Sequence, residues 1–303
     1  MKHELSILIP VYNGNCTRQV EQLCQQAEAI SQLSYEIIVA DDGSSQQQCI
    51  EANKAIEALP HCRYIIRKKN CGRAVIRNFL AQQARYEWLL FQDCEMDIVR
   101  PDFLHAYLES AAQEVAYGGY IVGKAPAGKN LRYIYEKAAE PAHTTEQRRK
   151  HPYRDFHTAN FMIRRDLMLA HPFDERFRHY GYEDVLLGKQ LRKAGIGIDH
   201  IDCPVGFSIF EDNARFVAKT EEGIRTLWQF RKDLRGYNSL LTLTNGMHLG
   251  ITKAAIRLWH RVFGSLERRH LCGDAPSLTI FKLYKLGYFL SLTNSIKQND
   301  YDT

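Results

Sequence analysis

Three groups of carboxylates in the sequence have spacings that suit metal binding or acid-base chemistry. In chain order they are Asp41-Asp42, Asp93-x-Glu95 and Glu183-Asp184. Carboxylate oxygens are good ligands for divalent cations, and a carboxylate can also accept a proton from a reacting hydroxyl. In an extended segment Asp93 and Glu95 point to the same side, as two ligands of one cation must.

Each group also has a plainer interpretation. Asp41 and Asp42 would cap the helix that follows them. Glu183-Asp184 would begin a helix, where the macrodipole favours negative charge. A helix is predicted to begin near residue 100, and Asp97 is better placed than Asp93 to cap it.

Basic residues follow a glycine at residues 72–77. Gly72 would let the backbone approach a ligand closely. Arg73 and Arg77 lie on one face of a predicted helix start, and their forked donors suit a diphosphate. A solvated basic helix face is the alternative for either arginine alone.

The elements that would position these residues alternate in type along the first hundred residues. Short apolar runs predict strands at residues 5–12, 36–40, 62–66 and 87–92, and apolar residues at helical spacing predict helices at 17–31, 46–59 and 74–84. This rhythm predicts an α/β fold with a mainly parallel sheet flanked by helices. Ligands of such sheets bind at the carboxyl ends of the strands, where the polar groups lie.

The remaining chain is predicted to contain more sheet and then mostly helices. Residues 113–123 predict sheet, 124–154 a mobile basic loop with one short helix, and 196–201 a last strand; helical patterns cover 216–233, 252–271 and 277–296. We therefore predict a catalytic domain at residues 1–220, with halves at about 1–100 and 101–220, and a helical C-terminal extension at 221–303.

Composition narrows the class of protein. The 303 residues carry a net charge of +5, a mild bias that suits phosphates or anionic headgroups and falls short of a nucleic-acid-binding protein. The eight cysteines lack C-x-x-C pairs, so we expect free thiols in a reducing compartment. No signal peptide pattern or long apolar run occurs, which predicts a cytoplasmic protein.

Two turns resemble the opening of glycosyltransferase family 2. They are Pro-Val-Tyr-Asn at residues 10–13 and Asp-Asp-Gly-Ser at residues 41–44. The resemblance implies the GT-A fold, a Rossmann-like domain that binds nucleotide sugars. It also implies that Asp41 contacts the base, that Asp42 lies near the ribose, and that Pro10 and Tyr12 belong to the nucleotide-binding turn.

Further segments resemble the same family in the same order. Asn-Cys-Gly-Arg at residues 70–73 and Arg-Asn at 77–78 are similar to its Asn-x-Gly and Ala-Arg-Asn elements, which implies nucleotide contacts for Gly72, Arg73, Arg77 and Asp93. Residues 157–165 and the Gly-Tyr-Glu-Asp turn at 181–184 resemble its acceptor half. The resemblance makes Asp184 the general base and gives Glu183 a part in holding the acceptor sugar.

The metal motif departs from the family pattern. Asp93-x-Glu95 stands where Asp-x-Asp is usual, and residues 204–208 lack the histidine that often supplies a third ligand. The resemblance implies a divalent cation, Mn²⁺ or Mg²⁺, held by Asp93 and Glu95, with Asp97 as a substitute ligand. The departures predict weak metal dependence, or ligands drawn from water and phosphate alone. His200 is predicted to be a packed strand residue.

The function implied is inverting transfer of a sugar, from a UDP-hexose or UDP-N-acetylhexosamine to a saccharide or lipid-linked saccharide, in glycan or polysaccharide biosynthesis. One alternative is a non-catalytic nucleotide- or sugar-binding partner in a glycan assembly complex. A nucleotidyltransferase is a third interpretation, although residues after Ile9 lack the Gly-rich loop expected of one.

The last predicted helix has a broad apolar surface interrupted by lysines. It includes Leu278, Phe281, Tyr284 and Phe289. Packing on the catalytic domain is the simpler interpretation. The alternative is a peripheral contact with anionic lipid at the inner face of a membrane.

Overall fold

A computed structural model describes residues 1–94, 96–247 and 250–299 of the chain, with side chains to residue 292. The chain divides into two compact units. Unit 1 comprises residues 1–123, 140–178 and 183–209, and unit 2 comprises 124–139, 179–182 and 210–303. The division therefore falls after residue 209, whereas the sequence placed a boundary at 220, inside a helix.

Unit 1 is built on a seven-stranded sheet in the order β3-β2-β1-β4-β8-β6-β9. Its strands are β1 (Glu4–Val11), β2 (Ser34–Asp41), β3 (Cys62–Ile66), β4 (Trp88–Gln92), β6 (Val115–Tyr117), β8 (Asn160–Arg164) and β9 (Ile198–His200). Strand β8 runs antiparallel to both of its neighbours, and the other pairs are parallel. The predicted mainly parallel α/β fold is confirmed.

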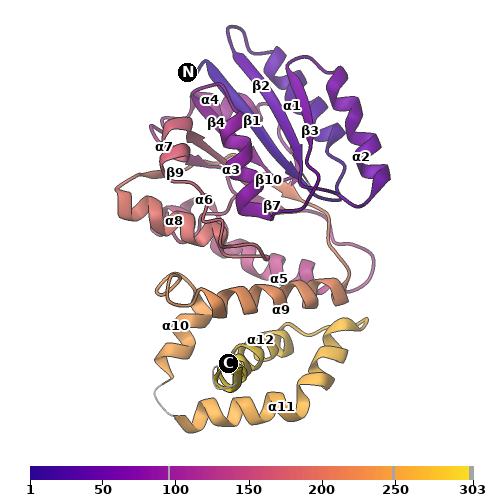
Figure 1. Ribbon diagram of the computed structural model, residues 1–303, viewed down its shortest axis with the longest axis vertical. Helices are drawn as coiled ribbons and strands as arrows, with labels where there is room; N and C mark the ends of the chain where they lie inside the picture. The colour runs from indigo at the N-terminus through magenta and orange to yellow at the C-terminus, as the bar shows by residue number, and fades with distance from the viewer. Residues whose placement is uncertain (95, 248–249, 300–303) are drawn as a thin grey trace. The chain divides into compact units, whose positions relative to one another are not determined.

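Helices cover both faces of this sheet (Figure 1). One face packs on α1 (Thr17–Glu28), the 3₁₀ helix η1 (Lys54–Ala58) and α4 (Phe103–Glu109). The other packs on α3 (Arg73–Gln83), α7 (Arg165–Ala170) and α8 (Glu183–Ala194). The central strands β1, β2 and β4 are buried on both faces, which explains why their sequences are mostly apolar.

A second sheet in unit 1 has three short strands in the order β5-β10-β7: β5 (Met96–Asp97), β7 (Tyr120–Val122) and β10 (Val205–Phe207). The predicted sheet at 113–123 is therefore two strands in two different sheets. The strand predicted at 196–201 is not the last one, because β10 follows it.

The segment predicted to be a mobile loop with one short helix is mostly helical, so that prediction is wrong. It contains α5 (Leu131–Ala139), η2 (Glu140–His143) and α6 (Thr145–Lys150). The Thr144 side chain caps α6 by accepting a hydrogen bond from the Gln147 N–H. Leu131 of α5 is fully buried, which a solvated loop residue would not be.

Unit 2 contains α5 and the helices α9 (Asn213–Gln229), α10 (Ser239–Gly246), α11 (Gly250–Cys272) and α12 (Leu278–Asn299). Asp212 and Asn238 cap α9 and α10 through their side-chain oxygens. Helix α12 lies between α9 and α11 (Figure 1). Helix α10 has no counterpart in the sequence prediction.

The apolar residues of α12 form the interior of unit 2. Phe281, Tyr284 and Phe289 are buried, and Phe281 and Tyr284 pack with Phe216 of α9 and Leu131 of α5. The surface proposed from the sequence as a membrane contact is therefore covered by protein. No helix in the described residues is long and apolar enough to cross a membrane.

Candidate active site

The predicted site residues of the first two strands lie at one edge of the sheet. β1 and β2 are parallel and in register, so that Val11 at the end of β1 lies opposite Asp41 at the end of β2. β4 is also parallel to β1 and ends immediately before Asp93. This edge is where parallel sheets bind ligands.

Asp41 is fully buried and fixes the turn that it begins. Its Oδ1 accepts a hydrogen bond from the Ser44 N–H at 2.7 Å, and its Oδ2 accepts one from the Tyr64 hydroxyl at 2.9 Å. Burial and the bond to Asp41 both raise the pKa of Tyr64, so this phenol remains a donor. Asp41, which the family resemblance expects to contact the nucleotide base, thus also stabilises its own turn.

Asp42 ties two loops together. Its Oδ2 accepts the Cys71 N–H at 3.0 Å and the Gly72 N–H at 2.9 Å, and its Oδ1 pairs with Arg67 at 3.0 Å. Burial raises the pKa of Asp42, although these three partners act in the opposite direction. Asp42 therefore holds the loop in which α3 begins.

The turn after β1 is held against the turn after β2. Asn13, with φ +54°, accepts hydrogen bonds from the Ser45 and Gln46 N–H groups at 2.8 and 2.9 Å. These bonds satisfy backbone donors at the start of α2 (Gln47–Asn53). Next to Asn13, the Tyr12 side chain is 50% exposed and Pro10 is half-buried. The exposed ring of Tyr12 is a suitable platform for a nucleotide base.

Gly72 stands where no other residue fits without strain. Its φ is +94°, and a Cβ there would lie 3.0 Å from the Arg178 carbonyl oxygen. Gly72 caps α3, so Arg73 is the first helical residue, and its side chain is 46% exposed. Arg73 therefore remains accessible beside the strand ends.

Arg77, one turn further along α3, points into the protein. It is 1% exposed, and its Nη2 pairs with Asp93 Oδ1 at 2.7 Å. Its Nη1 lies 3.4 Å from Glu183 Oε1, and the same oxygen lies 4.0 Å from Arg73 Nη1. The Arg77 guanidinium thus links the end of β4 to the start of α8. The family resemblance instead implies that Arg77 contacts the nucleotide.

Glu183 and Asp184 begin α8 in different environments. Burial raises the pKa of Glu183 and the charge of Asp184 adds to this effect, whereas Arg73 and Arg77 oppose it. The preceding residues, Gly181 and Tyr182, have φ values of +100° and +71°. A tyrosine in this region is strained, and such strain is concentrated at functional sites.

Asp184 is paired with His157, a residue for which the sequence analysis predicts no role. Asp184 Oδ2 lies 3.2 Å from His157 Nδ1, and its Oδ1 accepts the Val185 N–H at 2.7 Å. Burial alone would raise the pKa of Asp184, but the His157 contact and the Val185 bond leave it below its usual value. These contacts favour the carboxylate form of Asp184, which is the form that can accept a proton.

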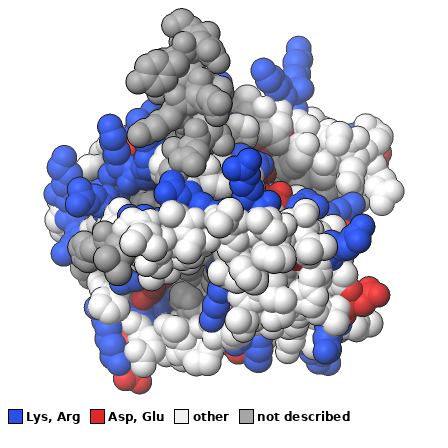
Figure 2. Space-filling model, turned by 90° about the horizontal axis from the view of Figure 1, so that it is seen from below, with Lys and Arg blue, Asp and Glu red and all other residues white. Residues whose placement is uncertain are grey.

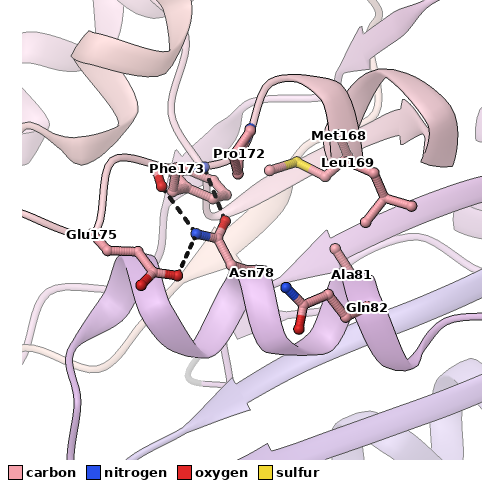
Figure 3. Close-up of a pocket in the computed structure, with 8 residues that line it drawn as sticks. All are labelled: Asn78, Ala81, Gln82, Met168, Leu169, Pro172, Phe173 and Glu175. Atoms are coloured by element: carbon pink, nitrogen blue, oxygen red, sulfur yellow. Dashed lines mark hydrogen bonds between the residues drawn. The ribbon is translucent and has the colours of Figure 1, made fainter.

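Asn78, next to Arg77, anchors the chain that leads toward α8. Its side chain donates to the Phe173 carbonyl oxygen at 2.9 Å and to Glu175 Oε1 at 3.0 Å, and accepts from the Phe173 N–H at 2.9 Å (Figure 3). A cavity of about 190 Å³ lies beside it between α3 and α7. None of the predicted site residues lines this cavity.

The described residues form no clear metal site. They contain no group of three His, Cys, Asp or Glu side chains that could hold a metal ion. Asp93 shares its Oδ1 with Arg77, and Glu95 lies outside the described residues. His200 is packed as predicted: it lies near the carbonyl oxygen of Pro152, and burial lowers its pKa to about 4.

Comparison with curated proteins finds two polysaccharide synthases. The chondroitin synthase of Escherichia coli is 27% identical over 231 residues, which cover 63% of this chain and 32% of the relative. That of Pasteurella multocida (strain Pm70) is 25% identical over 233 residues, which cover 65% of this chain and 24% of the relative. The chain thus spans about a third and a quarter of the lengths of these relatives.

Two solved structures share the fold at low sequence identity. Residues 1–349 of TarS from S. aureus superpose with a TM-score of 0.52 and 14% identity, covering 99% of this chain and 92% of that one. The mannosyltransferase PcManGT from Pyrobaculum calidifontis, in complex with GDP-Man and Mn²⁺, gives 0.56 and 12%, covering 98% and 87%. The predicted GT-A fold is confirmed.

The family assignment rests on the part of the chain that carries the nucleotide-binding turns. Residues 6–170 match the model of this family, and they include β1, β2, β4 and α3 with the loops between them. The match covers more than half of the 303 residues. The chain is a glycosyltransferase that belongs to glycosyl transferase family 2.

Proposed function

We propose that this protein transfers a sugar from a nucleotide sugar to a saccharide or lipid-linked saccharide acceptor with inversion at the anomeric carbon. In this proposal Asp184 takes the proton of the acceptor hydroxyl as its oxygen attacks the anomeric carbon. The bond from that carbon to the diphosphate breaks on the opposite face, and the nucleoside diphosphate leaves. Arg73, half-exposed at the start of α3, offsets its developing charge.

The Arg77 bridge is the observation that carries the proposal. A salt bridge of 2.7 Å to Asp93 and a contact of 3.4 Å to Glu183 bring the end of β4 and the start of α8 to one guanidinium group. Asp184 is next to Glu183 in sequence. A diphosphate beside Asp93 and a hydroxyl beside Asp184 would then face each other across a short distance, as displacement requires.

The nucleotide would bind along the edge formed by the strand ends. We assign the base and ribose to the turns of Pro10, Tyr12, Asp41 and Asp42, and the diphosphate to Gly72 and Arg73. Arg77 acts in this proposal as an internal link that positions Asp93 and Glu183, because its burial keeps it from solvent. Glu183 holds the acceptor only indirectly, through the start of α8.

A divalent cation, Mn²⁺ or Mg²⁺, is part of the proposal. Asp93 and Glu95 would hold it together with phosphate oxygens and water, and its chemistry would be to neutralise diphosphate charge. One oxygen of Asp93 already pairs with Arg77, and Asp93 and Glu95 are separated by a single residue. These features favour a cation site whose remaining ligands come from the nucleotide.

The relatives support the acceptor class. Both curated relatives are named as chondroitin synthases, enzymes that build a polysaccharide. A growing saccharide is therefore the acceptor that we propose, with UDP-hexose or UDP-N-acetylhexosamine as the donor.

The test compares Asp184→Asn with the unchanged protein. Release of nucleoside diphosphate is measured over a panel of nucleotide sugars with saccharide acceptors, with and without Mn²⁺, alongside nucleotide affinity. Asn keeps the shape of the side chain but cannot take up the proton, so turnover should fall about 10²–10⁴-fold while nucleotide affinity stays nearly constant.

Asp166→Asn, at an exposed carboxylate, is the matched control and should leave both quantities unchanged. Full turnover by Asp184→Asn would remove Asp184 as the base. Nucleotide binding without release from any donor would instead favour the non-catalytic binding protein.

A further inference from the structure

Helix α11 of unit 2 exposes an apolar stripe. Ile251, Leu258, Val262 and Leu266 are 81%, 63%, 56% and 58% exposed. They stand at positions i, i+7, i+11 and i+15, a spacing that places them on one face of a helix. The stripe extends for about four turns, or roughly 23 Å.

The opposite face of α11 is buried and more polar. Gly264, Glu267 and Leu271 are its buried residues. Glu267 accepts a hydrogen bond from Trp259 Nε1 at 2.8 Å and lies 3.5 Å from His260 Nδ1. Soluble helices normally turn the apolar face inward, so this reversed arrangement indicates that the outward face has an apolar partner.

Charge restricts the kind of partner. Helix α11 carries five cationic side chains, Lys253, Arg257, Arg261, Arg268 and Arg269, and its single acidic residue, Glu267, is buried. Figure 2 shows Lys and Arg side chains around a stretch of other side chains, with few Asp or Glu. A second copy of the same face would bring like charges together, which disfavours self-association.

Two aromatic rings lie beside the stripe. The rings of Trp259 and Phe263 are 4.4 Å apart, and their side chains are partly exposed. Amphipathic aromatic rings favour the boundary between headgroups and acyl chains. Arginine and lysine stems can lie along apolar surface while their charged ends reach phosphate groups.

We propose that α11 lies flat on a membrane surface with anionic headgroups. The stripe of Ile251, Leu258, Val262 and Leu266 inserts at the level of the first acyl carbons, and the exposed side chains of Arg261 and Arg269 contact the phosphates. This surface differs from the one that the sequence indicated, since Phe281, Tyr284 and Phe289 of α12 are buried. It is independent of the sugar-transfer proposal.

The experiment uses the full chain and vesicles of phosphatidylcholine with or without phosphatidylglycerol. The unchanged protein should co-sediment with the anionic vesicles, less so in high salt, and only weakly with neutral ones. The variant Leu258→Ser/Val262→Ser should lose roughly tenfold in binding to anionic vesicles. Arg261→Glu/Arg269→Glu should lose the dependence on anionic lipid.

The matched control is Leu169→Ser/Ile209→Ser, which changes two exposed apolar residues of unit 1. It should bind vesicles like the unchanged protein, and thermal melting should find all variants folded. Equal vesicle binding by Leu258→Ser/Val262→Ser and the unchanged protein would overturn the proposal. So would a concentration-dependent dimer that this variant abolishes without any vesicle binding by the unchanged protein.

Discussion

The proton affinity of Asp184 is set by two opposing influences. Burial favours the neutral carboxylic acid, whereas hydrogen bonding by His157 and the Val185 N–H favours the carboxylate, and the pKa is lowered overall. The rings of Tyr117, Tyr120 and His143 surround His157, with ring centroids 5.9 to 6.3 Å away. His157 is therefore placed to hold Asp184 in its basic form.

Replacing His157 by Ala should move the acid limb of the pH profile. Burial would then dominate, so the pKa of Asp184 would rise and the carboxylate would be lost at a higher pH. We expect kcat/KM to fall most in acidic buffer and least in alkaline buffer. The measurement is kcat/KM for nucleoside diphosphate release across pH.

His157→Gln, which retains a donor, should restore part of the profile, and the exposed His105→Ala should not change it. A uniform loss at every pH in His157→Ala would mean that His157 has only a structural role.

The sequence motifs name candidate site residues but not the partners that the structure gives them. Asp93, Glu183 and Asp184 could be identified because each lies within a local motif. The pairing of His157 with Asp184 joins residues 27 positions apart, and no local pattern encodes that distance. The inward direction of Arg77 depends on how α3 packs on the sheet, which its i, i+4 spacing from Arg73 does not fix.

At the scale of elements, the start of α3 depends on a close approach between two backbones. Gly72 adopts a positive φ and faces the Arg178 carbonyl oxygen, while Gly195 adopts φ +75° with no atom near its missing Cβ. Both positions penalise a side chain through φ. At Gly72 the backbone, with φ +94° and ψ 165°, lies in a region essentially restricted to glycine, and a Cβ would also meet the Arg178 carbonyl oxygen, so a side chain is penalised more there than at Gly195.

Gly195→Ala should lower the free energy of unfolding by about 1 kcal/mol, the penalty of a left-handed alanine. Gly72→Ala should lower it further, by about 2–3 kcal/mol, and should also weaken nucleotide binding because Arg73 moves with the helix start. Urea unfolding and nucleotide titration measure the two effects. Equal losses of stability would contradict the extra penalty that the backbone and the Arg178 contact impose at Gly72.

Long elements could be predicted from the sequence and short ones could not. The strands β1, β2, β3 and β4 contain apolar runs, and turn-forming residues follow them in the sequence. β5, β7 and β10 have two or three residues each, too few for any periodicity. Helix α5 was missed because its apolar residues Leu131 and Tyr135 meet partners more than 80 residues away in the sequence, Phe216 and Phe281.

At the scale of the whole molecule, unit 2 is assembled from three separate stretches of chain. Helix α5 belongs to the second unit although it is encoded between two stretches of the first. Leu131 is fully buried among Phe216, Leu271 and Phe281, all of which come after residue 209. A chain that ends at 209 therefore lacks the residues that cover α5.

We expect the truncated chain 1–209 to aggregate and to bind a hydrophobic dye, because Leu131 and Tyr135 lose their apolar partners. Size-exclusion chromatography measures the aggregation, and dye fluorescence measures the exposed apolar surface. Leu131→Ser/Tyr135→Ser in the same truncated chain should reduce both signals. A monomeric, dye-free 1–209 would contradict the dependence of α5 on the later helices.

The interleaved order of the two units also bears on how the chain folds during synthesis. A ribosome releases the nascent polypeptide from its N-terminus, so every strand of the seven-stranded sheet has emerged once residue 200 is free of the exit tunnel. By then α5 has already left the exit tunnel. Its apolar side stays uncovered until Phe281 has been synthesised. The apolar side of α5 is thus exposed to solvent on the nascent chain while the residues that later cover it are being synthesised.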